Sequence, residues 1–147
     1  MPGTLGAFFG SIVFLVFYNS PVWSELNFAL YTVVISLYAI WLGGKAEFAW
    51  GVKDPYQFVM DEVAGVAYAF LFVGLWIPPE DWFAPFVIAG AGFLIFRYFD
   101  IAKPGVIKKV EKYPGGLGIN FDDFLSGVFT GIILHAGCFV WYGLIRA

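Results

Sequence analysis

The sequence predicts an all-α membrane protein, a polytopic bundle of about five helices in one domain that spans residues 1–147. Of its 147 residues, 61% are hydrophobic and only 13% are charged, whereas soluble globular domains carry about 25% charged residues. The mean hydropathy is +0.80. The few charges gather in short stretches between long uncharged ones, as they do in a protein that crosses a bilayer several times.

Five stretches without a charged residue are the expected helices: 1–24, 26–44, 63–79, 82–96 and 124–145. A membrane-spanning helix needs about 20 residues, and about 17 at the least. The second and the last stretches meet this length, while the third and fourth are short. The turn between the short stretches, Pro78-Pro79-Glu80-Asp81, is expected in the headgroup region.

The first stretch contains Gly3, Gly6 and Gly10 near its beginning. We expect these glycines to interrupt it, so that its apolar part is 5–18 and forms either a full span or a re-entrant helix. The N-terminus lacks the positively charged start of a signal peptide, and we therefore expect it to belong to the mature protein.

The loop charges predict the orientation. If all five helices cross, then the N-terminus and the segments 45–62 and 97–123 share one face. Seven of the eight cations fall on this face: Lys45, Lys53, Arg97, Lys103, Lys108, Lys109 and Lys112. Because positive loops stay inside, this face is predicted to be cytoplasmic, with the N-terminus inside. Eight of the eleven acids lie there too, although topology requires only the cations.

Composition excludes several classes of protein. A single cysteine, Cys138, leaves no intramolecular disulfide and no cysteine-based zinc site. The net charge of −3 argues against a nucleic-acid partner, which would need a basic face. Nothing in the sequence indicates a protein partner.

Two acidic pairs stand out on the predicted cytoplasmic face. Pro55 favours a helix start, which would put Asp61 and Glu62 about two turns into the third helix. The glycine-rich segment 115–123 is expected to be a turn, with its acidic pair in the first turn of the fifth helix. A glycine follows each pair, at 65 and at 127, which indicates close helix packing near the site.

Adjacent carboxylates repel each other unless a cation is present, most strongly near a low-dielectric boundary. Capping of a helix N-terminus gains only about 0.3–1 kcal/mol, and the expected positions suit this role for the second pair only. Hard oxygen ligands without clustered His or Cys instead favour Mg²⁺ or Mn²⁺ over zinc. The candidate metal ligands are Asp61, Glu62, Asp122 and Asp123, or a subset of them.

Cations interleave with these acids, and Lys53, Arg97 and Lys103 are suited to phosphate oxygens, with Arg97 able to make bidentate contacts. Acids and cations together indicate a phosphorylated substrate. His135 is expected to be a hydrogen-bonded residue within the membrane, away from this chemistry. Lys108, Lys109 and Lys112 are expected to rest on anionic headgroups.

The polar segments resemble those of the bacterial phosphatidylglycerophosphatase A family over nearly the whole chain. The residues that carry the resemblance are Gly3-Thr4-Leu5-Gly6, Lys53-Asp54-Pro55 with Asp61-Glu62-Val63-Ala64-Gly65, the segment from Phe96 to Pro104, and Gly115-Gly116-Leu117-Gly118-Ile119 with Asp122-Asp123 and Gly127. Each motif is weak, but their order and spacing together are specific.

The resemblance implies a Mg²⁺-dependent phosphatase of the inner membrane that converts phosphatidylglycerophosphate to phosphatidylglycerol at the cytoplasmic face. The implied catalytic residues are Asp61, Asp100, Asp123 and Lys103, and the implied substrate-binding residues are Thr4, Lys53, Asp54, Arg97 and Lys103. Asp100 is a ligand, a general base or a nucleophile, and the nucleophile itself is either water or a carboxylate.

Two other functions are weaker fits. A CDP-alcohol phosphotransferase also uses acids and Mg²⁺, but its D-G-x₂-A-R-x₈-G-x₃-D-x₃-D signature is absent from the sequence. A small membrane transporter would place charges near the midplane, where this sequence is apolar apart from His135.

Overall fold

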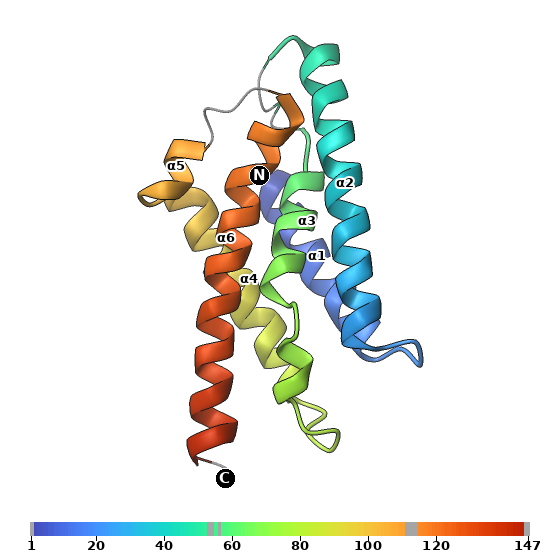
Figure 1. Ribbon diagram of the computed structural model, residues 1–147, viewed down its shortest axis with the longest axis vertical. Helices are drawn as coiled ribbons and strands as arrows, with labels where there is room; N and C mark the ends of the chain where they lie inside the picture. Colours follow the sequence, from blue (N-terminus) through green and yellow to red (C-terminus); the bar gives the residue numbers. More distant parts are fainter. Residues whose placement is uncertain (1, 53–54, 56, 111–114, 146–147) are drawn as a thin grey trace.

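The computed structural model describes residues 2–52, 55, 57–110 and 115–145, and this part of the chain is helical without any strand. The elements in order are α1 (Pro2–Tyr18), α2 (Glu25–Trp50), α3 (Met60–Ala69), the 3₁₀ helix η1 (Val73–Trp76), α4 (Ala84–Ala102), α5 (Val106–Val110), α6 (Gly115–Cys138) and the π-helical turn η2 (Phe139–Ile145). The predicted all-α fold class is confirmed, with α5 as a short additional helix (Figure 1).

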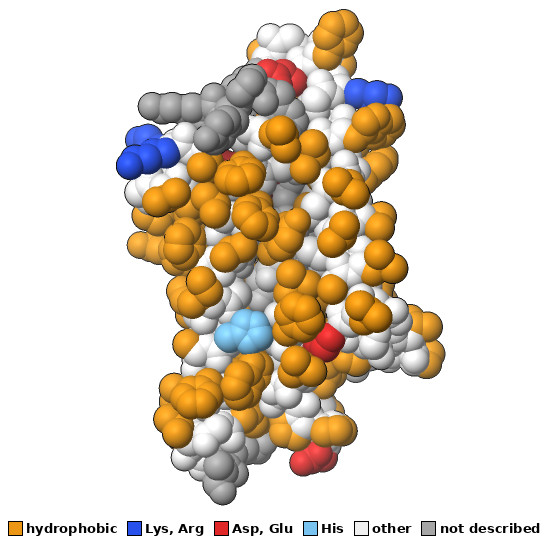
Figure 2. Space-filling model, in the orientation of Figure 1, with side chains coloured by type: hydrophobic (Ala, Val, Ile, Leu, Met, Phe, Trp, Pro, Cys, Tyr) orange, Lys and Arg blue, Asp and Glu red, His pale blue; other side chains and the backbone are white. Residues whose placement is uncertain are grey.

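Three helical segments in the described ranges are long and apolar enough to cross a membrane: Glu25–Trp50, Ala84–Ala102 and Leu117–Ile145. Helix α1 is a shorter apolar helix. The principal helices alternate in direction, so that the start of α1, the end of α2 and the starts of α3 and α6 lie at the same end as α5 (Figure 1). We call this the α5 end. The Lys and Arg side chains visible in Figure 2 lie there, and hydrophobic side chains cover most of the remaining visible face.

The hydrophobic core draws residues from α1, α2, α3, α4 and α6, and its aromatic centre lies where α1, α2 and α3 meet. The rings of Phe14 and Phe70 stack with their centroids 4.3 Å apart, and Phe28 packs edge-on against Phe14. All three side chains are at most 1% exposed. This aromatic contact fixes α1 and α2 against the end of α3.

Helix α1 runs without interruption from Pro2 to Tyr18, so the expected break at its glycines is wrong. The glycines lie instead against α3. A Cβ atom at Gly6 would be 2.9 Å from the Val59 carbonyl oxygen, and one at Gly10 would be 2.2 Å from a methyl group of Val66. Small residues at such spacing let helix backbones approach closely, which brings the start of α1 to the start of α3.

The predicted close packing at the two later glycines is confirmed. A Cβ atom at Gly127 would lie 2.0 Å from the carbonyl oxygen of Gly65, and one at Gly65 would lie 2.8 Å from the Asp123 backbone oxygen. Helices α3 and α6 therefore touch backbone to backbone, directly beside the second acidic pair.

The third expected helix, 63–79, is not continuous. Helix α3 ends at Ala69, and Phe72 adopts the left-handed conformation, with φ of 59°, before η1 begins. His135 of α6 accounts for this break. Its Nδ1 accepts a hydrogen bond from Trp76 Nε1 at 2.8 Å, so Nε2 carries the proton and donates to the Leu71 carbonyl oxygen at 2.9 Å.

Broken helices inside a membrane protein need such partners for their freed backbone groups. The predicted role of His135 as a hydrogen-bonded residue within the bundle is thus confirmed.

The expected start of the third helix is also wrong. Pro55 opens a turn, in which its carbonyl oxygen accepts the Phe58 N–H at 2.8 Å, and α3 begins only at Met60. Asp61 and Glu62 therefore lie in the first helical turn rather than two turns into the helix.

The segment 115–123 is helical rather than a turn, because α6 begins at Gly115. Ile119 is buried with Ala46 and Phe58 in a small apolar cluster, and this packing offsets the low helix propensity of the glycines. Asp122 and Asp123 consequently lie about two turns inside α6. The first acidic pair, expected two turns into its helix, lies in the first turn, and the second pair, expected in a first turn, lies two turns inside α6. Helix capping therefore does not explain the second pair.

Candidate active site

Six charged side chains from three helices converge near the α5 end. They are Glu62 of α3, Arg97, Asp100 and the C-cap residue Lys103 of α4, and Asp122 and Asp123 of α6. We call these six residues the charged cluster. Asp123 is at its centre, since it interacts electrostatically with Glu62, Asp100, Asp122 and Lys103.

The cluster contains two ion pairs, one within α4 and one between the end of α4 and α6. Arg97 pairs with Asp100 one turn later on α4, and Lys103 Nζ lies 2.5 Å from Asp122 Oδ2 on α6. Lys103 ends α4 in the left-handed conformation, with φ of 41°, and its N–H bonds to the Phe99 carbonyl oxygen at 2.8 Å. A non-glycine residue rarely adopts this conformation. Here it accompanies the contact between the Lys103 amine and α6.

The carboxylates of the cluster are unusually buried for charged groups. Asp122 and Asp123 are each 4% exposed, and Asp61 is equally buried. Among the described residues, no hydrogen-bond partner contacts Glu62 Oε2, Asp122 Oδ1 or Asp123 Oδ1, and none contacts Arg97 Nε. Unsatisfied buried polar atoms are costly, so these atoms are suited to ligands from outside the chain.

The environment of Glu62 shows the balance of charges. The pKa of its carboxyl group is raised above the ordinary value, mainly because the group is buried and also because the Asp100 carboxylate is near. A hydrogen bond with the Asp61 side chain and the charge of Arg97 act in the opposite direction and lower the pKa. Carboxylates of α3 and α4 therefore oppose each other's charge, and a cation between them would relieve this repulsion.

The donor set fits Mg²⁺, because three buried carboxylate oxygens of the charged cluster have no hydrogen-bond partner among the described residues. In the described part of the chain, however, no three His, Cys, Asp or Glu side chains stand close enough together to hold a metal ion. Mg²⁺ commonly takes one or two carboxylates and completes its shell with water and phosphate. The full four-residue ligand set predicted from the sequence thus stays a prediction.

The structure brings together most of the residues predicted for the site. Asp61 Oδ1 accepts the Glu62 N–H at 3.0 Å, which holds this carboxylate at the edge of the charged cluster. Thr4 is half-buried and follows Gly3, whose Cβ atom would lie 2.2 Å from Glu62 Oε1. Lys53 and Asp54 lie outside the described residues.

Two residues near the site were not predicted from the sequence. Gly3 lets α1 approach both Glu62 and Arg97, and Asn120 is buried beside the second acidic pair. The recurrence of glycine at positions 3, 6 and 10 was the available signal for the first, because it marks one face of a helix. No pattern along the chain distinguishes Asn120.

This arrangement can perform phosphoryl chemistry. The cations Arg97 and Lys103 can hold phosphate oxygens, and the carboxylates can hold a divalent ion. Asp100 pairs with Arg97 and lies close enough to Asp122 and Asp123 to interact with them electrostatically. Carboxyl groups that can accept or donate a proton therefore lie beside the cations of the charged cluster.

Comparison with known proteins identifies the family. The sequence model for phosphatidylglycerophosphatase A matches residues 1–137. A protein of Bacteroides thetaiotaomicron named "Putative phosphatidylinositol-3-phosphatase" is 36% identical over 138 residues, covering 90% of this chain and 80% of the relative.

Two relatives carry the family's name. Phosphatidylglycerophosphatase A of Haemophilus influenzae is 32% identical, with 92% of this chain and 77% of the relative covered. The protein of the same name from Escherichia coli is 31% identical, with 92% and 73% covered. No solved structure matches this chain. The match of the family model over nearly the whole chain, together with these relatives, shows that the chain belongs to the phosphatidylglycerophosphatase A family.

Proposed function

We propose that this protein is a Mg²⁺-dependent phosphatase that removes the terminal phosphate of phosphatidylglycerophosphate to give phosphatidylglycerol. The observation that supports this most is the charged cluster, which combines buried carboxylate oxygens without partners with two cations at the end of a bundle of apolar helices. The names of the Haemophilus and Escherichia relatives supply the substrate.

The residues divide the work as follows. Arg97 and Lys103 bind the phosphate oxygens and neutralise the charge that develops on them. Asp123, with Glu62 or Asp122, would hold Mg²⁺, which when bound supplies a Lewis acid for the phosphoryl oxygens. Asp100 accepts or donates a proton, because its carboxyl group pairs with Arg97 and lies close enough to Asp123 to interact with it electrostatically. Attack by water and attack by a carboxylate both fit this arrangement.

We further propose that the protein is a multi-pass protein of the bacterial inner membrane, with the α5 end on the cytoplasmic side. The bias of Lys and Arg toward the loops at this end supports the orientation. The acyl chains of the substrate then stay in the bilayer while its headgroup reaches the charged cluster from the inner leaflet.

Purified protein in nanodiscs should release inorganic phosphate from phosphatidylglycerophosphate with Mg²⁺, and EDTA should reduce the rate to background. Added Mg²⁺ should restore the rate, because the carboxylates bind the ion reversibly. Release that is insensitive to EDTA would contradict the metal dependence.

The same assay with phosphatidylinositol-3-phosphate tests the activity that the name of the Bacteroides relative states. Faster release from that lipid would replace the proposed substrate. Formation of a phosphodiester from a CDP-activated lipid would indicate a phosphotransferase, and passage of ions without phosphate release would indicate a transporter.

A further inference from the structure

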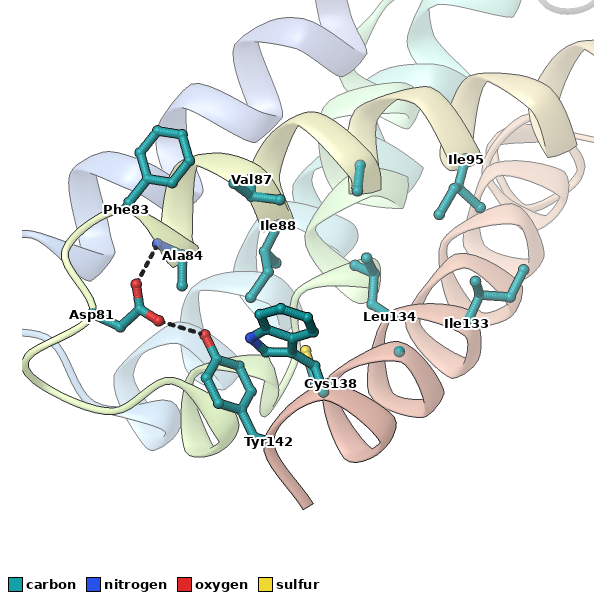
Figure 3. Close-up of a pocket in the computed structure, with 13 residues that line it drawn as sticks. Asp81, Phe83, Ala84, Val87, Ile88, Ile95, Ile133, Leu134, Cys138 and Tyr142 are labelled. Atoms are coloured by element: carbon teal, nitrogen blue, oxygen red, sulfur yellow. Dashed lines mark hydrogen bonds between the residues drawn. The ribbon is translucent and has the colours of Figure 1, made fainter. Parts of the chain in front are cut away.

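An apolar groove of about 620 Å³ lies between α4 and α6, away from the charged cluster (Figure 3). Ile95 and Ile133 line the part nearer the α5 end. At the other end, the Tyr142 hydroxyl donates a hydrogen bond to Asp81 Oδ2 at 3.1 Å. Between these ends the lining is aliphatic and aromatic. Both walls belong to helices that are long and apolar enough to cross a membrane.

The groove continues the line of contact between α4 and α6 that begins at the charged cluster. We call this line of contact the seam. On α4, steps of four residues lead from Lys103 through Phe99 to Ile95, and residues at this spacing share one side of a helix. On α6, a step of seven residues, about two turns, leads from Asp122 to Phe129, and a step of four leads on to Ile133. Lys103 pairs with Asp122, and the rings of Phe99 and Phe129 stack with centroids 5.6 Å apart. The seam is thus polar at the α5 end and apolar below it.

The groove begins within the leaflet nearest the charged cluster and continues past the bilayer midplane. At 1.5 Å per residue, Ile95 lies about 8 Å, Ile88 about 18 Å and Ala84 about 24 Å along α4 from Asp100. Half of the hydrocarbon core is about 15 Å. A lipid whose phosphate contacts the charged cluster would therefore have its tail beside Ile95, and the end of a long acyl chain would reach Ile88.

Two small residues keep this space open. Ala91 of α4 and Gly137 of α6 line the groove, and a Cβ atom at Gly137 would meet nothing within 4 Å. A larger side chain at Gly137 would therefore enter the groove without a backbone clash.

We propose that the α4–α6 groove binds an acyl chain of the substrate whose phosphate occupies the charged cluster. The inference rests on the proposed function and adds to it a site that selects for the lipid tail. Continuity of the seam favours a substrate chain over a second copy of the protein or a permanently bound lipid.

The substitution Gly137→Leu tests this. We expect it to lower the ratio of kcat/KM for dipalmitoyl over dihexanoyl phosphatidylglycerophosphate by at least about fivefold, because the leucine side chain would displace buried methylenes of the longer chain and each of these contributes roughly fourfold to binding. Gly90→Leu is the matched control. Gly90 is an exposed α4 residue outside the groove, with nothing within 4 Å of its Cβ position. The Gly90→Leu variant should keep the wild-type ratio of kcat/KM for the two lipids.

An unchanged ratio in Gly137→Leu would overturn the groove assignment alone, provided that the wild type hydrolyses both lipids. Absence of phosphate release from either lipid by the wild type would instead overturn the proposed function.

Photo-crosslinking gives a readout that does not need turnover. A phosphonate analogue of phosphatidylglycerophosphate with a diazirine in its acyl chain should label 84–95 and 133–142, and excess unlabelled analogue should suppress this labelling. Equal suppression by phosphatidylcholine would indicate a general lipid site and overturn the proposal. Oxidative dimerisation through Cys138, which also lines the groove, with no lipid labelling would show that a second copy covers it and would likewise overturn the proposal.

Discussion

Replacement of Asp123 with asparagine is expected to lower kcat by about 10³-fold while the bundle stays folded. Asp123 is 4% exposed and interacts with the charges of both helices that face α6 at the site. Asparagine has the same shape but supplies neither an anionic metal ligand nor a proton acceptor. Losses of about 10²–10⁴ are typical when an acid–base group or an electrostatic stabiliser is removed.

Phosphate release at saturating lipid measures the effect, with thermal unfolding in detergent as the check on folding. Because the substitution removes repulsion among buried carboxylates, the unfolding temperature should not fall. Glu80→Gln, at an exposed acid in the turn before α4, is the matched control and should keep wild-type kcat. Full activity in Asp123→Asn would show that the charged cluster is not the catalytic centre.

The second large effect is on stability. Gly127→Val should destabilise the protein by about 3 kcal/mol or more, at the upper end of overpacking costs, because its Cβ atom would lie 2.0 Å from the Gly65 carbonyl oxygen. That atom belongs to a helix backbone, which cannot rotate away as a side chain can. The substitution forces α3 and α6 apart directly beside Asp123, so any folded fraction should also lose activity.

The yield of folded protein and its unfolding temperature in detergent test this expectation. Gly90→Val introduces the same side chain into a membrane helix where nothing lies within 4 Å of the Cβ position, and its unfolding temperature should stay within a few degrees of the wild type. An equal unfolding temperature for Gly127→Val would mean that α3 and α6 do not pack as described.

The fold class and most of the site could be predicted because each depends on local chemistry. Long uncharged stretches become helices in a bilayer wherever their exact ends lie. The members of the charged cluster could be identified because adjacent acids beside apolar helices repel each other unless a cation is present, and cations interleave with them along the chain. The glycines at 65 and 127 marked a helix contact correctly because only a missing side chain allows that approach.

The errors arise where a distant residue decides the local structure. The end of α3 at Ala69 depends on His135 and Trp76, which satisfy the broken segment from another part of the chain. Helix α6 includes its glycine-rich start because Ile119 packs near α2. Likewise, the pairing of Lys103 with Asp122 joins two helices whose relative position no spacing along the chain reveals.

The central claim is that a divalent ion and a lipid-borne phosphoryl group complete the charged cluster. The most direct measurement is electron–nuclear double resonance on protein loaded with Mn²⁺, in place of Mg²⁺, and a non-hydrolysable phosphonate analogue of phosphatidylglycerophosphate. We predict a ³¹P coupling from a phosphoryl group bound directly to the ion, absent in Asp123→Asn. Tight Mn²⁺ binding without ³¹P coupling, or coupling that persists in Asp123→Asn, would contradict the account.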